Sequence, residues 1–143
     1  MNISEVMTRE VRIATPDDNL QTAARLMDEY DVGLLPVGEN DRLVGMLSDR
    51  DITVRAVAQG ISPQEGKVRD VMTSDVKYIH DDESVEEAAR NMSDLQVRRL
   101  PVVDGDNRLV GIVSLGDLSL SEEECAGAAL SSISQPAGVD AYL

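Results

Sequence analysis

The chain has 143 residues, which fits one compact domain or two very small domains that share a core. Hydrophobic residues make up 42% of the sequence and aromatic residues only 2%, so any core must be aliphatic, which suits buried strands flanked by helices. The formal net charge of −14 argues against nucleic acid as a partner, because the phosphate backbone would be repelled.

Cysteine content and the N-terminal sequence indicate a cellular compartment. Cys125 is the single cysteine, so no disulfide can form within the chain and no CxxC metal motif exists. This favours a reducing environment, and we expect a cytoplasmic protein. The polar segment Met1 to Met7 predicts no signal peptide, and no apolar run approaches the roughly 18 residues that a membrane span needs. We therefore expect no membrane partner.

An internal duplication is the most informative feature of the sequence. Val-Met-Thr at 6–8 recurs at 71–73, an offset of 72 − 7 = 65 residues between the two methionines. Ala-Ala-Arg and Leu-Pro-Val recur at the same offset, and Arg-Leu-Val-Gly recurs after one inserted residue. So many matches in order indicate two copies of one structural unit.

Each copy predicts the element order strand, helix, strand, strand, helix. The first helix carries apolar residues at i, i+3, i+4 and i+7, which gives one buried face, and Gly, Asn and Asp between the next two strands predict a turn at 38–41. The first copy is predicted to contain a strand at Val11–Ala14, a helix capped by Asn19, strands at Gly33–Val37 and Leu43–Ser48, and a helix from Asp49 to Gly60.

The second copy repeats this pattern and sets the expected domain boundaries. It is predicted to contain a strand at Val76–Ile79, a helix capped by Ser84, strands at Arg98–Val103 and Leu109–Ser114, and a helix from Leu115. We expect the first repeat at 1–60, a linker at 61–67, the second repeat at 68–120, and an acidic C-terminal helix with a loose tail at 121–143.

The two copies resemble the cystathionine-β-synthase (CBS) domain family. The resemblance lies in the segments EVMT and DVMT, LLPV and RRLPVVD, and LVGMLS and LVGIVS, and it covers about Ile3 to Leu120. It implies a stand-alone CBS pair, or Bateman module, of the bacterial type. The implied fold is α/β (α+β), with two repeats packed in pseudo-twofold symmetry around two clefts. The resemblance also implies a homodimer formed through helices and clefts that bind AMP, ADP, ATP or another adenosyl compound.

The ligand signature of that family is Gly, apolar, any residue, Ser or Thr, two further residues, Asp, and it occurs at Gly45–Asp51 and Gly111–Asp117. A hydroxyl at the start of a helix can hold a phosphate oxygen, and a carboxylate can accept hydrogen bonds from vicinal ribose hydroxyls. An ordinary helix cap is the alternative explanation. The residues expected to contact the ligand are Ser48 and Ser114 for phosphate, Asp51 and Asp117 for ribose, and Met46 and Ile112 for the base.

The resemblance implies further contacts. The residues before the Leu-Pro-Val strands and those after Met-Thr are expected beside the base: Val32, Gly33, Val97, Val11 and Val76. Arg98 and Arg99 stand where some nucleotide-sensing relatives hold phosphate with a His-Arg pair, whereas the first copy has no charge there, so we expect two unequal clefts. A surface pair is the alternative for these arginines. Arg50 either reaches a phosphate or is solvated.

The sequence offers little for catalysis. His80 is the only histidine, Cys125 lies among acidic residues, and neither a P-loop nor GxGxxG is present. We therefore expect no enzyme, no catalytic residue, no metal and no required cofactor. The expected function is a sensor that binds an adenine nucleotide and signals to a regulated protein by a conformational or oligomeric change. A ligand-independent dimerisation or interaction module remains the alternative.

Overall fold

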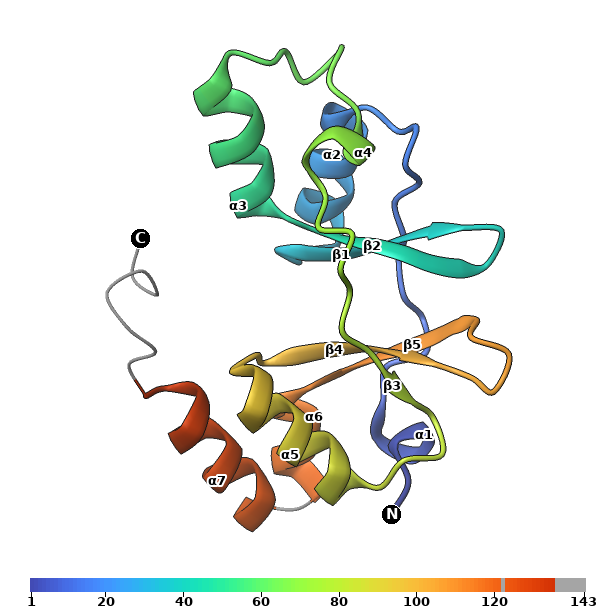
Figure 1. Ribbon diagram of the computed structural model, residues 1–143, viewed down its shortest axis with the longest axis vertical. Helices are drawn as coiled ribbons and strands as arrows, with labels where there is room; N and C mark the ends of the chain where they lie inside the picture. The colour runs from blue at the N-terminus through green and yellow to red at the C-terminus, as the bar shows by residue number, and fades with distance from the viewer. Residues whose placement is uncertain (122, 136–143) are drawn as a thin grey trace. The chain divides into compact units, whose positions relative to one another are not determined.

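The computed structural model describes residues 1–121 and 123–135, and the chain forms two compact units (Figure 1). One unit, called here the Asp51 unit, comprises Glu10–Lys77 and Asn107–Leu109. The other, the Asp117 unit, comprises Met1–Arg9, Tyr78–Asp106 and the described residues from Val110 onward. Each sequence repeat therefore contributes residues to both units.

In the Asp51 unit, α2 (Leu20–Tyr30) has the cap that the sequence predicts and most of the predicted buried face, but Ala24 at the i+4 position is exposed. Asn19 Oδ1 accepts a hydrogen bond from the Thr22 backbone N–H at 2.8 Å, which satisfies one of the unpaired donors at the start of the helix. Leu20, Ala23 and Met27 are buried on one face. This helix positions the hairpin that comes after it.

The hairpin of the Asp51 unit pairs β1 (Leu34–Glu39) with β2 (Arg42–Ser48) in antiparallel register. Asn40 and Asp41 both have positive φ, 54° and 66°, and together they close a two-residue turn. Asn and Asp adopt this left-handed conformation more readily than other non-glycine residues. The turn is consequently shorter than the four residues that the sequence suggests.

A continuous helical run comes after β2, but its hydrogen bonding changes along its length. It consists of α3 (Asp49–Asp51), a π-helical segment η1 (Ile52–Ala56) and a 3₁₀ segment η2 (Val57–Gln59). Gly60 ends the run with φ 79°, a conformation that glycine adopts without a steric penalty. The sequence predicts these bounds correctly but not the π turn. The unit continues with α4 (Val68–Val71).

An ion-pair cluster joins α4 to the segment before α2. Arg69 Nη2 donates a hydrogen bond to Asp17 Oδ1, and Lys67 Nζ lies 3.9 Å from the same oxygen. The hydrogen bond and the charge of Arg69 hold the pKa of the Asp17 carboxyl below its usual value. These side chains are well exposed, so the cluster contributes to local order more than to overall stability.

In the Asp117 unit, β4 lies between β3 and β5, and β3 pairs with β4 in parallel. Ser84 Oγ caps α5 by accepting from the Glu87 backbone N–H at 3.1 Å. The tail expected after the last helix and the side chain of Cys125 lie outside the described residues. The elements are α1 (Ile3–Val6), β3 (Ile79–His80), α5 (Val85–Leu95), β4 (Arg99–Val103), β5 (Leu109–Ser114), α6 (Leu115–Ser121) and α7 (Glu123–Ile133).

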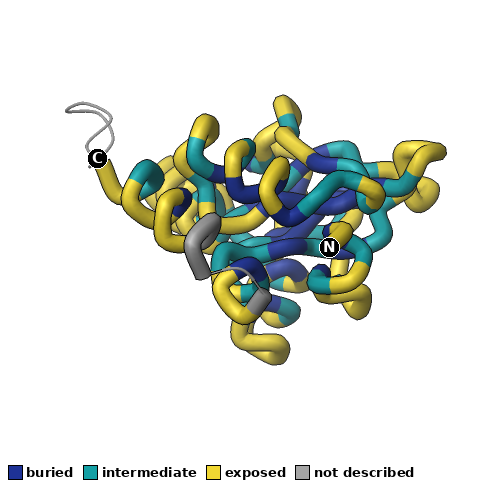
Figure 2. Tube along the Cα trace, turned by 90° about the horizontal axis from the view of Figure 1, so that it is seen from below, coloured by how far each residue is buried: buried dark blue, intermediate teal, exposed yellow. Residues whose placement is uncertain are grey.

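Each unit has its own aliphatic core, to which both strands and helices contribute buried residues. Figure 2 marks the buried positions along the chain in dark blue. The largest fully buried side chains in the Asp51 unit include Leu20, Leu35, Leu47 and Val68. Those of the Asp117 unit include Ile3, Ile79, Met92, Leu100 and Leu118. No described helix is long and apolar enough to cross a membrane.

The first strand expected in each copy is wrong in extent. Val11–Ala14 reduces to a single bridge, in which Ala14 N donates to Pro36 O and Gly38 N donates to Ala14 O. Extension of this parallel ladder to Arg12 would need an N–H from Pro36, which proline lacks. The strand expected at Val76–Ile79 starts only at Ile79, and Pro101 stands at the corresponding place in β4.

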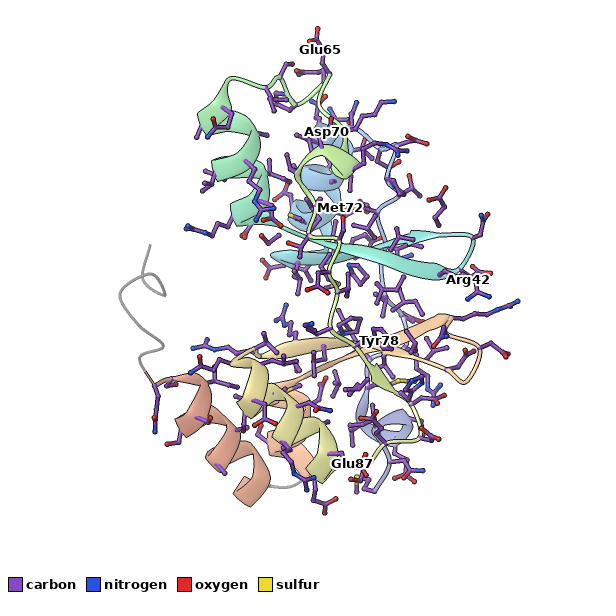
Figure 3. All side chains as sticks on the ribbon, in the orientation of Figure 1. Arg42, Glu65, Asp70, Met72, Tyr78 and Glu87 are labelled. Atoms are coloured by element: carbon purple, nitrogen blue, oxygen red, sulfur yellow. The ribbon has the colours of Figure 1, made fainter. Side chains whose placement is uncertain are left out.

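The Met-Thr segment of each repeat pairs with the hairpin of the other repeat. Thr8 and Ile112 exchange backbone hydrogen bonds of 2.8 and 3.0 Å, and Thr73 and Met46 exchange bonds of 2.8 and 2.9 Å. Figure 3 labels Met72 beside β2, to which this pairing brings it. The sequence repeats and the compact units are therefore different divisions of the chain.

Candidate functional site

Two equivalent strand-to-helix junctions carry the candidate site residues, the first junction at Ser48–Asp51 and the second at Ser114–Asp117. In the first, Ser48 Oγ accepts from Asp51 N at 3.0 Å, and Asp51 Oδ2 accepts from Ser48 N at 2.9 Å. The second repeats both bonds, at 3.1 and 2.9 Å. These reciprocal caps fix each carboxylate beside a hydroxyl, and they use Oδ2 and leave Oδ1 and the hydroxyl hydrogen outside the cap.

A backbone hydrogen bond ties each junction to the residue that precedes its partner strand. Asp49 N donates to Gly33 O at 2.9 Å, and Leu115 N donates to Arg98 O at 2.8 Å. The adjoining Val32 and Val97 are half-buried. In each copy, the structure thus brings the Ser-x-x-Asp junction next to the residues that precede the Leu-Pro-Val strand, as the sequence analysis expects.

The apolar residues expected at the base lie on the same strand face as the serines. Met46 and Ser48 are half-buried on one face of β2, whereas Gly45 and Leu47 are buried on the other, as strand alternation requires. Ile112 and Ser114 have the same arrangement on β5. Each junction therefore presents an apolar side chain, a hydroxyl and, one helical turn on, a carboxylate.

The other expected base contacts are less evenly distributed. Val11 and Val76 are both half-buried, and both belong to the Asp51 unit. Within its own unit, only the first junction therefore has such residues. Their role stays a prediction.

The charges around the two junctions differ. Arg98 and Arg99 are exposed at the start of β4, where the first copy has Gly33 and Leu34. At the first junction Arg50 is exposed, and its backbone N–H donates to Asp49 Oδ1 at 2.8 Å. Asp49 comes directly after Ser48, whereas Leu115 comes directly after Ser114. The first junction therefore carries one more carboxylate than the second at the residue after the serine.

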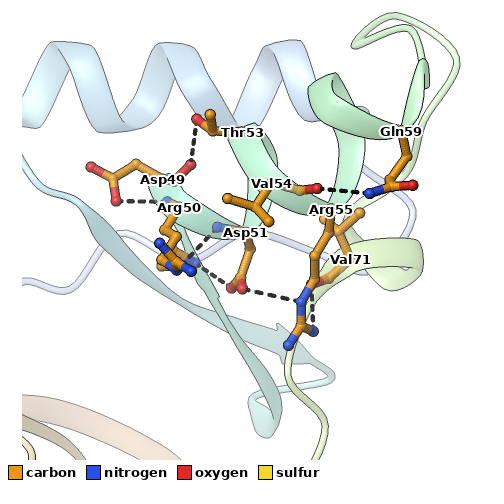
Figure 4. Close-up of polar contacts among 9 residues, drawn as sticks. Asp49, Arg50, Asp51, Thr53, Val54, Arg55, Gln59 and Val71 are labelled. Carbon is orange, nitrogen blue, oxygen red and sulfur yellow. Dashed lines mark hydrogen bonds and ion pairs between the residues drawn. The ribbon is translucent and has the colours of Figure 1, made fainter. Parts of the chain in front are cut away.

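Arg55 lies beside the first junction, and the sequence analysis did not include it among the candidate site residues (Figure 4). Its Nε lies 3.7 Å from Asp51 Oδ1, and its Nη1 donates to the Val71 carbonyl at 3.4 Å. The spacing of four residues along a helix was an available signal, because such pairs face each other. The Thr8 and Thr73 pairings had no such signal, since the two Met-Thr segments look alike in sequence.

Within the described residues, no group of three or more His, Cys, Asp or Glu side chains could hold a metal ion. His80 contacts Tyr78 instead, with the two rings edge to face and their centroids 5.8 Å apart. The described residues thus provide no ready metal centre.

Comparison with known proteins finds one family in both repeats. The CBS domain family model matches residues 3–57 and 68–121. The chain is 43% identical to the CBS domain-containing protein YhcV of Bacillus subtilis over 93% of its own length and 95% of that protein.

Two similar solved structures contain ligands. The crystal structure of CBSX2 in complex with AMP matches with a TM-score of 0.72 and 32% identity, over 86% of this chain and 96% of that one. The CBS domain pair of protein MJ0100, in complex with 5-methylthioadenosine and S-adenosyl-L-methionine, matches with a TM-score of 0.72 and 28% identity, over 84% of this chain and 94% of that one.

Proposed function

The chain belongs to the CBS domain family, and from this we propose that it is a regulatory protein that binds an adenosine nucleotide or another adenosyl compound at its two junctions. The observation that carries the proposal is the pair of Ser-x-x-Asp caps, each beside a half-buried apolar side chain. The same constellation occurs twice in one chain.

Each group suits one part of such a ligand. The Oδ1 atoms of Asp51 and Asp117 are acceptors, so they can receive hydrogen bonds from the vicinal hydroxyls of a ribose. Met46 and Ile112 offer apolar surface to a purine. Ser48, Ser114 and the guanidinium groups of Arg50, Arg98 and Arg99 can donate to phosphate oxygens.

The ligands of the two solved relatives support this choice. AMP, 5-methylthioadenosine and S-adenosyl-L-methionine share the adenosine moiety and differ in the group attached to the 5′ carbon. Adenosine recognition is therefore the common requirement, and the charged residues around each junction are the part of the site that selects the 5′ group.

The regulatory part of the proposal is a population shift. A ligand changes the equilibrium between two states only to the extent that it binds one of them more tightly. We propose that the chain is a cytoplasmic homodimer formed through helices and that a partner protein responds to the ligand-favoured state.

Calorimetric titration of the full chain with AMP, ATP, NAD and S-adenosylmethionine tests the proposal, with GMP as a control for the base. We expect at least one adenosyl ligand to bind with a Kd below about 1 mM, equivalent to roughly −4 kcal/mol, and to raise the melting temperature. GMP should bind more weakly. If no adenosyl ligand binds at this level, the proposal is wrong and a ligand-independent interaction module replaces it.

A further inference from the structure

The ribose-binding carboxylates proposed for the two junctions have different surroundings. Asp51 is part-buried, with its side chain 15% exposed, and its Oδ1 atom faces Arg55. The residue four positions after Asp117 is Ser121, so the second junction has no arginine at the matching place. One carboxylate therefore has a guanidinium beside it and the other has none at this position.

Arg55 is held in this position from two sides. Its Nε faces the Asp51 carboxylate from within η1, while its Nη1 donates to the Val71 carbonyl of α4 (Figure 4). An arginine side chain that already has two partners loses less conformational entropy when a ligand binds beside it than a fully mobile side chain does. Although 56% of its side chain is exposed, Arg55 thus places a positive charge next to the atom proposed to accept the ribose.

This charge acts in opposite directions on two classes of ligand. The guanidinium competes with a ribose hydroxyl for Asp51 Oδ1, which weakens the binding of every nucleoside. It also offsets the negative charge of Asp49 and Asp51, which would otherwise repel an anionic 5′ group. An uncharged nucleoside experiences only the competition, whereas a nucleotide also gains the attraction.

We propose that Arg55 is a specificity-determining residue, which makes the first junction prefer adenosine ligands with an anionic 5′ group over uncharged adenosine. This inference rests on the proposed function. Arg55 would favour a phosphate at the first junction, whereas Arg98 and Arg99 would favour one at the second junction. The two junctions would then respond differently to the same mixture of adenosyl compounds.

The test is a titration of the ¹⁵N-labelled full chain with AMP and, separately, with adenosine, in which the amide signals of Ser48 and Asp51 report the first junction alone. In the Arg55→Gln variant, we expect adenosine to bind more tightly and AMP less tightly. The ratio of the two affinities should fall about tenfold, which corresponds to about 1.4 kcal/mol. Arg55→Lys keeps the charge and should retain most of the ratio.

Arg25→Gln is the matched control, because it removes an exposed arginine of α2 in the same unit. It should leave the ratio unchanged, and thermal melts check that all variants fold. An unchanged ratio in Arg55→Gln, or equal losses in Arg55→Gln and Arg55→Lys, overturns the inference while the proposed function stands. If neither ligand shifts these amides in the wild-type chain, nucleotide binding at the first junction fails and the inference fails with it.

Discussion

Gly111 and Gly45 are the residues of β5 and β2 that lie closest to the paired Met-Thr segments. A Cβ at Gly111 would lie 2.7 Å from Met7 Sδ and 2.8 Å from the Thr8 carbonyl oxygen. At Gly45 it would lie 2.7 Å from Met72 Sδ and 3.0 Å from the Thr73 carbonyl oxygen. A methionine side chain can move, but the paired backbone cannot move without losing its hydrogen bonds. Glycine is required here for space.

Gly111→Ala should therefore destabilise the chain by about 1–3 kcal/mol, because the added methyl group overpacks against the Thr8 backbone. Chemical denaturation measures the effect. Gly105→Ala is the control, since nothing lies within 4 Å of a Cβ at that position. If both variants are equally stable, Thr8 does not pack against β5 as closely as described.

At the scale of elements, α1 and α4 occupy corresponding places in the two repeats but lie in opposite units. α1 comes from the first repeat and packs in the Asp117 unit, where Ile3 is fully buried. Val68 of α4, 65 residues later (68 − 3), comes from the second repeat and is fully buried in the Asp51 unit. Each unit thus depends on a short helix from the other repeat.

Ile3→Ala should reduce amide protection first in the Asp117 unit, although Ile3 belongs to the first repeat. Loss of the buried side chain should cost about 2–5 kcal/mol. The matched variant Val68→Ala should reduce protection first in the Asp51 unit, with a smaller loss because valine is smaller. Residue-resolved hydrogen exchange measures both. If Ile3→Ala instead reduced amide protection first in the Asp51 unit, the placement of α1 in the Asp117 unit would be wrong.

The sequence predicts the longer elements well, because their signals are local. α2 and α5 are predicted by helical periodicity and by the caps at Asn19 and Ser84, and β5 is predicted by its apolar run and flanking turn. Features set by tertiary partners escape this reasoning. The lost strand at Val11–Ala14 depends on a proline in β1, and the choice of partner for each Met-Thr segment depends on two copies that look alike.

On the scale of the whole molecule, the chain contains two junctions with the same backbone hydrogen bonds and different charges. The Ser-x-x-Asp motif in the sequence leads directly to both junctions, because the hydrogen bonds of the cap are local. The arginine beside Asp51 is specific to one copy, and although its spacing of four residues from Asp51 is visible in the sequence, its second contact, with Val71 of α4, depends on the tertiary fold. Duplication thus provides the common site, and substitutions in one copy distinguish the two junctions.

Asp51 and Asp117 are proposed to accept the ribose hydroxyls of an adenosine ligand, and the proposed function depends on these two contacts. The most direct test is calorimetric titration of AMP and 2′-deoxy-AMP into the wild-type chain and into the Asp51→Asn/Asp117→Asn double variant. Asparagine keeps an oxygen for the cap but loses the second carboxylate oxygen.

A hydrogen bond to a charged group contributes about 1.5–3 kcal/mol, so the wild-type chain should bind 2′-deoxy-AMP at least about tenfold more weakly than AMP. The double variant should bind the two ligands almost equally. Equal binding by the wild-type chain, or full discrimination by the double variant, would contradict the claim.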